Sequence, residues 1–190
     1  MQKPHIVILG LAAGLLAMPA WAADSYTIDP RHTFPSFEIG HFGWSTQRGR
    51  FDKTSGKITL DRTAKSGTVE VTIDAASVDT GVRARDEDLR GEGFFDVEKY
   101  PTMTFKSTRV RFEGDKPVAV DGEFMLRGVT KPMTLTITNF HCAPNPFVKK
   151  EVCGADALAT IQRSAFGMTK FLPAISDDVK LLIGVEAIKD

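Results

Sequence analysis

Apolar and polar residues alternate along most of the chain after Ala23. A period of two residues is that of a β-strand with one face toward the core and the other toward solvent. The alternation is clearest in residues 69–73 and 133–138, where threonines take the outward positions of the second segment. Shorter or less regular segments of the same kind are 103–105, 110–112, 118–126, 157–161 and 181–187. The pattern predicts an all-β protein of about eight strands.

Turn-forming residues separate these segments, at 54–56, 65–67, 113–115 and 128–132. Such short connections favour antiparallel neighbours. A long meander with one apolar face either folds into a sandwich or closes into a barrel, and closure also removes exposed strand edges. Neither a linker nor a repeat marks a second domain, so we expect one domain over residues 23–190.

Residues 82–90 break the alternation. Their composition predicts a short helix, and Gly91-Glu92-Gly93 ends it. We expect the aromatic residues that follow, Phe94, Phe95 and Tyr100, to plug one end of a barrel or to pack on its rim. The acidic run of residues 86–88 is interpreted as a solvated helix face.

The first 22 residues have the pattern of a secretory signal peptide. Lys3 precedes an apolar run over residues 6–18, and Ala20-Trp21-Ala22 is a small-x-small cleavage site. A run of this length would extend only about 20 Å as a helix, which is less than a hydrocarbon layer of about 30 Å. The sequence therefore predicts a signal peptide over residues 1–22, export to the periplasm and no stable insertion in a membrane.

The composition argues against nucleic acid as a partner and indicates what kind of residue fills the interior. The chain has 24 basic and 24 acidic residues, so no net positive field would attract nucleic acid. It has 13 Phe against 2 Tyr and 2 Trp. Because phenylalanine has no polar group, this excess suggests a large apolar interior.

Cys142 and Cys153 are the only cysteines. In an oxidising compartment a disulfide between them is expected. A nucleophilic Cys142 assisted by His141 is disfavoured, since adjacent residues of a strand point to opposite faces. The histidines at 32, 41 and 141 lack the close ligand pairs of zinc sites, so we expect no metal.

Most catalytic motifs are absent from the chain, among them the G-x-S-x-G elbow, H-E-x-x-H and the Walker A loop, and nothing points to a Ser-His-Asp triad. His41 is unusual because it is in phase with Phe37 and Ile39, which places it on the inward face. The arginines at 83, 85, 90 and 163 each resemble a surface charge. Together they are the best candidates to anchor a polar or anionic head group near a barrel mouth.

Several short motifs, in order, resemble the YceI-like family of bacterial periplasmic proteins, and the likeness extends from Tyr26 to about Lys189. The motifs are Ile28–Thr33, Phe37–Gly43, Gly49–Asp52, Ala75–Thr80, Arg85–Leu89, Phe94–Asp96 with Tyr100–Pro101, Gly128–Pro132 and Arg163–Gly167. The resemblance implies a lipocalin-like antiparallel β-barrel with a short helical insertion and a polyisoprenoid chain in an apolar channel. Phe34-Pro35 departs from the family pattern and predicts a kink in the first strand.

The resemblance and the apolar alternation together favour a non-enzymatic carrier of a polyprenyl lipid, such as an isoprenoid quinone or a polyprenyl phosphate, with no other cofactor. Its role would be transport, storage or stress response, and a homodimer is possible. Two alternatives stay open: a hydrolase or isomerase acting on a similar lipid, and a secreted module with a filled core and no ligand. The ligand-binding residues we expect are Phe37, Ile39, His41, Val71, Ile73, Arg83, Phe94, Phe95, Phe105, Phe124, Leu135 and Ile137.

Overall fold

The computed structural model describes residues 23–190, and the predicted signal peptide lies outside them. Strands dominate this part of the chain, and one α-helix and two short 3-10 helices complete it. The strands are β1 (Asp24–Ile28), β2 (Ser36–His41), β3 (Ser45–Phe51), β4 (Thr54–Asp61), β5 (Ser66–Asp74), β6 (Val78–Asp79), β7 (Thr102–Glu113), β8 (Lys116–Leu126), β9 (Val129–Asn145), β10 (Lys150–Gln162) and β11 (Ile175–Lys189). The helices are η1 (Ala75–Ser77), α1 (Arg83–Arg90) and η2 (Arg163–Phe166).

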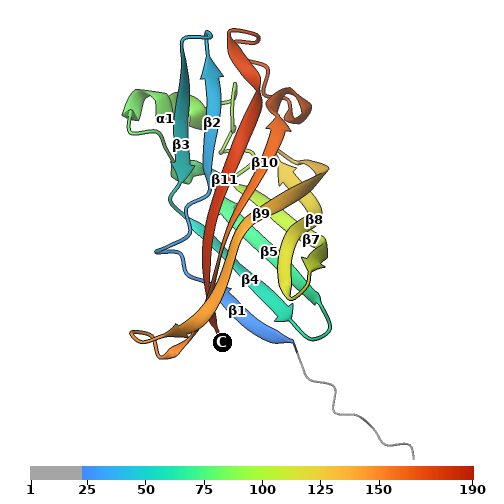
Figure 1. Ribbon diagram of the computed structural model, residues 1–190. Coiled ribbons are helices and arrows are strands. Elements are labelled where there is room, and N and C mark those ends of the chain that lie inside the picture. The colour runs from blue at the N-terminus through green and yellow to red at the C-terminus, as the bar shows by residue number, and fades with distance from the viewer. Residues whose placement is uncertain (1–22) are drawn as a thin grey trace, which may run out of the picture.

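Eight of the strands close into an antiparallel barrel, in the order β1, β4, β5, β7, β8, β9, β10 and β11 (Figure 1). The ring closes where β1 pairs with β11, with Tyr26 opposite Lys189 and Ile28 opposite Ala187. The predicted lipocalin-like barrel is therefore confirmed, and the sandwich is not formed. The predicted helix is confirmed as α1.

Strand β11 has two partners on the same side. Its end, at residues 187–189, pairs with β1, whereas its first half, at residues 175–182, pairs with β2. Strands β3 and β6 continue outward from β2, so these three strands extend the wall beyond the closed barrel. In Figure 1 the β2–β3 hairpin stands at the upper end, and the carboxyl terminus lies at the lower end.

The expected kink at Phe34-Pro35 is wrong, because both residues lie in the connection between β1 and β2. Proline has no N–H group to donate to a ladder, so it suits the point where the chain leaves one strand position for the next. The buried Pro35 still accepts a hydrogen bond at its carbonyl from the Phe51 N–H, at 2.9 Å.

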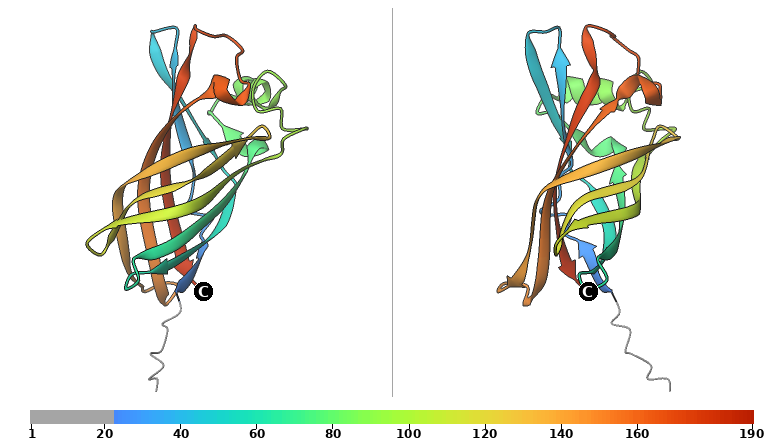
Figure 2. Two further views of the ribbon diagram at one scale, coloured as in Figure 1. Left: turned by 90° about the vertical axis from the view of Figure 1, so that its right-hand side faces the viewer. Right: turned by 45° about the vertical axis from the view of Figure 1, so that its right-hand side comes forward.

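Two apolar clusters form the interior of the barrel. The smaller one, at the lower end, contains the buried residues Tyr26, Ile28, Leu60 and Ala187. The larger one occupies the upper part and includes Phe105, Phe124 and residues from η1 and η2. Figure 2 shows α1 and η2 at this upper end, beside the β2–β3 hairpin.

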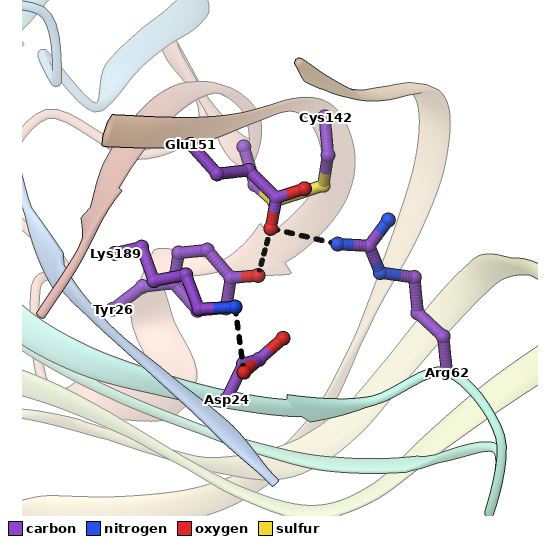
Figure 3. Close-up of a disulfide and its surroundings, with 7 residues drawn as sticks. Asp24, Tyr26, Arg62, Cys142, Glu151 and Lys189 are labelled. Carbon is purple, nitrogen blue, oxygen red and sulfur yellow. Dashed lines mark hydrogen bonds and ion pairs between the residues drawn. A yellow bond between two sulfur atoms is a disulfide. The ribbon is translucent and has the colours of Figure 1, made fainter. Parts of the chain in front are cut away.

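The lower end is tied together by the disulfide between Cys142 and Cys153, which confirms the predicted pair. The two cysteines lie opposite each other on β9 and β10, with a Cα–Cα distance of 4.1 Å. Close to them, the Tyr26 hydroxyl donates to Glu151 Oε1 at 2.6 Å, and Arg62 Nη2 donates to the same oxygen at 2.8 Å (Figure 3). Burial, and then the bond to Glu151, raise the pKa of Tyr26 to about 12.

Asp86 corrects the expectation of a solvated acidic face on the helix. Its side chain is buried and accepts hydrogen bonds from the Thr80 backbone N–H at 2.8 Å and the Thr80 hydroxyl at 2.7 Å. These bonds fasten α1 to the chain that leads into it. Asp86 therefore stabilises the position of the helix at the upper end of the barrel.

Candidate functional site: an apolar cavity with a polar mouth

A cavity of about 360 Å³ occupies the upper half of the barrel. Its walls come from the barrel strands, from the β2–β3 extension, and from α1 with the segments that flank η2. Most of its lining side chains are apolar. This size and character are typical of a pocket for a small apolar ligand.

One wall is formed by the inward faces of β5, β7 and β8. Val71, Phe105 and Phe124 lie opposite one another in successive strands, and all three line the cavity. The Phe105 ring lies directly over Gly122, where an added Cβ atom would come within 2.5 Å of the ring. Glycine at this position therefore gives the ring the space it occupies.

The opposite wall is formed by β2 and β11. Phe37 and Ile39 face Leu181 and Val179 in the ladder, and the four residues line the cavity together. His41 follows on the same face of β2 and also lines the cavity, half-buried, as its phase predicts.

The segment after α1 covers the cavity from the side. Phe95 packs edge-on against Phe51, with ring centroids 5.4 Å apart, and Phe94 lies 6.2 Å from Phe171. Arg127 holds this segment by donating to the backbone carbonyls of Glu92 and Phe94.

Polar side chains collect at the mouth. Arg85 donates to Gln47 Oε1 at 2.9 Å, and both residues line the cavity. Arg48, also in the lining, is paired with Glu38 at 2.9 Å. Among the described residues Arg85 has no acidic side chain within 4.0 Å, so its positive charge is the one at the mouth that is free to attract an oxygen-rich head group.

Arg163 differs from the surface charge that the sequence suggested, because it is 2% exposed. Its guanidinium donates to the backbone carbonyls of Ser176, Met168 and Ile175 at 2.7–3.0 Å. Burial lowers the pKa of this group. Arg163 also lines the cavity, and its three bonds fasten the segment between η2 and β11.

The structure brings most of the expected ligand-binding residues to this cavity, but two of them lie elsewhere. Arg83 does not line the cavity, since its side chain is 93% exposed and bonds to Glu87. Residues two apart on a helix point in different directions, and Arg85 is the one that reaches the cavity. Ile137 packs against the core cluster without lining the cavity. The expected residues that do line the cavity are Phe37, Ile39, His41, Val71, Ile73, Phe94, Phe95, Phe105, Phe124 and Leu135.

Sequence reasoning missed several other lining residues. Leu181, Ile183 and Met133 belong to alternating segments, so their phase could have identified them. Met168 and Phe171 lie in an irregular segment, where apolar and polar residues follow no strand or helix period that could have identified them. Within residues 23–190, no cluster of His, Cys, Asp and Glu is placed to hold a metal ion, and no helix is both long and apolar enough to cross a bilayer.

Comparison with known proteins agrees with this architecture. The model of the YceI-like domain matches residues 26–187. The chain belongs to the YceI-like family. A UPF0312 protein from Pseudomonas aeruginosa is 35% identical over an alignment of 192 residues, which covers all of both chains.

Two solved structures share the YceI-like fold. BcnA of Burkholderia cenocepacia superposes with a TM-score of 0.71 and 25% identity, over 84% of this chain and 98% of BcnA. A domain from Saccharophagus degradans, described as a polyisoprenoid binding domain implicated in plant cell wall breakdown, has a TM-score of 0.65. It is 18% identical over 87% of this chain and 98% of that domain, so it supports the fold alone.

Proposed function

We propose that this YceI-like protein binds a polyisoprenoid lipid, with the isoprenoid chain in the cavity and the head group at the mouth. The observation that carries the proposal is the shape and chemistry of the cavity. Apolar residues of the lower cluster close it below, and Phe171, which lines it above, is 52% exposed at the opening. A long apolar molecule with one polar end matches this arrangement.

The apolar lining supplies the driving force. Transfer of one five-carbon isoprene unit from water contributes up to about 4 kcal/mol, at about 0.8 kcal/mol per carbon. Three units contribute about 12 kcal/mol, which is the scale of a nanomolar dissociation constant before the costs of association and ordering are subtracted. Tight binding therefore needs no charged contact with the chain.

The mouth offers donors to an oxygen-bearing head group. Arg85 can donate two parallel hydrogen bonds, and Gln47 beside it can reorient its amide. The carbonyl of an isoprenoid quinone and the phosphate of a polyprenyl phosphate both accept such bonds. Replacement of Arg85 by glutamine is expected to weaken the binding of a polyprenyl phosphate more than the binding of a quinone, because only the phosphate carries a charge.

A carrier is favoured over a lipid hydrolase by the partners of the hydroxyl groups in the lining. Ser36 donates to the Phe34 carbonyl at 3.0 Å, and Thr80 donates to Asp86. In the described part of the chain neither hydroxyl is bonded to a histidine that could act as a base. The family relationship supports the same choice, and the signal-peptide pattern supports a place in the periplasm.

Extraction of the purified protein with organic solvent, followed by mass spectrometry, tests the proposal. Protein prepared without detergent is expected to yield an isoprenoid lipid, or to take up an added one. Leu135→Lys places a charge in the cavity and is expected to reduce the bound lipid, whereas Thr136→Lys, on the outward face of the same strand, is the matched control. A folded protein that neither yields nor takes up polyprenyl lipid would overturn the proposal.

A further inference from the structure

Three large aromatic side chains stand exposed at the upper end of the molecule. Phe42 is 49% exposed, Trp44 is 80% exposed and Phe171 is 52% exposed, and we call these three residues the aromatic tip. Phe42 and Trp44 lie at the turn of the β2–β3 hairpin and stack with ring centroids 5.1 Å apart. The Phe42 N–H donates to the Ala174 carbonyl at 2.6 Å, so the hairpin and the segment that carries Phe171 are joined. Figures 1 and 2 show both segments at the same end.

The backbone of the aromatic tip has positive φ angles at two phenylalanines, which bulky residues disfavour. Phe42 and Gly43 have φ values of 52° and 71°, and the Trp44 N–H donates to the His41 carbonyl at 3.0 Å, as in a type I′ turn. Such turns favour asparagine followed by glycine, and a bulky residue rarely adopts this φ. Phe171 has a φ of 63°. Two phenylalanines thus occupy positions that local energetics disfavour, and both expose their rings, which points to a function.

The tip is continuous with the opening of the cavity. Phe171 is exposed and also lines the cavity. His41, another lining residue, lies 4.8 Å from the Phe42 ring. Whatever contacts the tip therefore lies beside the entrance.

The charges around the tip identify the chemistry of the partner. Residues 40–47 and 167–175 contain no acidic residue and one lysine, Lys170. That lysine is paired with Asp88 at 2.6 Å and lies over the Phe171 ring. A surface of this kind has aromatic rings but little net charge. Tryptophan and other large aromatics with these surroundings concentrate where proteins meet the interface of a bilayer.

We propose that the aromatic tip docks the mouth of the cavity onto the surface of a lipid bilayer. The rings enter the interfacial region while the barrel stays outside. Docking would place the opening against a source or acceptor of lipid, so the inference extends the proposed function. It is tested separately, because attachment to vesicles and lipid content are different measurements.

All strands and both core clusters lie within residues 23–190, so a chain beginning at Ala23 carries the whole described fold. In that chain Trp44 is the one tryptophan, since the other is Trp21. Vesicles of phosphatidylcholine, or of equal parts phosphatidylethanolamine and phosphatidylglycerol, are expected to shift its fluorescence to shorter wavelength. Brominated acyl chains are expected to quench it. Because the tip has little charge, added salt should weaken attachment to the phosphatidylcholine vesicles, which carry no net charge, only slightly.

Variants separate docking from folding. Phe42→Asn suits the turn, so it should leave the melting temperature unchanged or raised while co-sedimentation with vesicles falls about tenfold, which corresponds to about 1.4 kcal/mol. Phe171→Ala should act in the same direction. Phe147→Ala is the matched control, because Phe147 is 92% exposed in the β9–β10 hairpin at the other end of the barrel and should not affect attachment.

Equal attachment of Phe42→Asn and the parent protein would overturn the docking proposal, as would failure of the parent to bind either kind of vesicle. A fluorescence shift that appears without vesicles and grows with protein concentration, together with a dimer in sedimentation, would overturn it in favour of a surface between two copies. Lipid extraction from the same samples keeps the two proposals apart. Protein that docks but never carries lipid would leave the tip assigned and the carrier function refuted.

Discussion

Replacement of Tyr26 by phenylalanine isolates one hydroxyl at the lower end of the barrel. Tyr26 is 1% exposed, and its hydroxyl donates to Glu151 at 2.6 Å. A hydrogen bond to a charged acceptor contributes about 1.5–3 kcal/mol, and its loss also leaves the carboxylate with one donor fewer. At neutral pH we therefore expect Tyr26→Phe to lower the free energy of unfolding by about 1.5–3 kcal/mol.

The effect should change with pH in a defined direction. The pKa of Tyr26 is raised from 10.0 to about 12 in the folded protein. Between these values the unfolded chain releases the phenolic proton while the folded chain retains it, so stability falls as pH rises. The loss approaches about 1.4 kcal/mol for each pH unit, or roughly 3 kcal/mol in total. The variant has no such proton, and its stability should approach that of the parent protein.

Urea unfolding of both proteins at matched pH values, with the disulfide intact, measures this difference. Lysines and the other tyrosine titrate in both proteins, so their effects cancel in the comparison. The difference in unfolding free energy should be constant at neutral pH and should shrink between about pH 10 and pH 12. A difference that stays constant through this range would refute the assigned role of Tyr26.

Three further predictions concern other parts of the molecule. Serine at Cys142 or Cys153 should lower the unfolding free energy by about 2–3 kcal/mol without abolishing lipid uptake; loss of uptake by a folded variant would contradict the separation of the lower end from the cavity. Gly122→Ala should destabilise by about 1–3 kcal/mol, because the new Cβ meets the Phe105 ring at 2.5 Å and a backbone carbonyl at 2.6 Å; an unchanged melting temperature would show that both can move freely. The bond from the Arg31 side chain holds the pKa of the buried Asp29 well below its usual range, so Asp29→Asn should destabilise near neutral pH and progressively less as pH falls below about 4; a difference independent of pH in acid unfolding would count against this.

The sequence predicted the barrel well because period-two alternation is a local signal that reports directly which face of a strand is buried. The same signal placed Val71, Phe105 and Leu135 on the cavity wall. It was weaker for β3, whose polar residues cover an extension rather than the closed core, and for the two-residue β6. It also gave no indication that β11 would serve two partners.

The mouth was less predictable because its residues come from segments without a period. Arg83 and Arg85 are similar in sequence context, and only the rotation of α1 decides which of them faces the cavity. Arg163 resembled a surface charge because its partners are backbone carbonyls contributed by residues 168–176. Every residue has a backbone carbonyl group, so the sequence does not show which carbonyls will accept hydrogen bonds. A buried arginine that bonds to them therefore cannot be recognised from side-chain types.

The divided pairing of β11 marks the lower limit of the cavity. Where β1 is the neighbour, the ring has eight strands, and the lower cluster around Tyr26 and Leu60 packs inside it. Beyond the fork β2 replaces β1 as the neighbour of β11, and the residues of β11 that line the cavity lie between Ile175 and Ile183, in or next to this part of the strand. If the proposed lipid binding is adopted, we expect each added pair between β11 and β1 to shorten the cavity and the isoprenoid chain it holds, and each pair removed to lengthen both. Under that proposal, strand pairing at residues 187–189, outside the cavity lining, helps to set the length of chain that is bound.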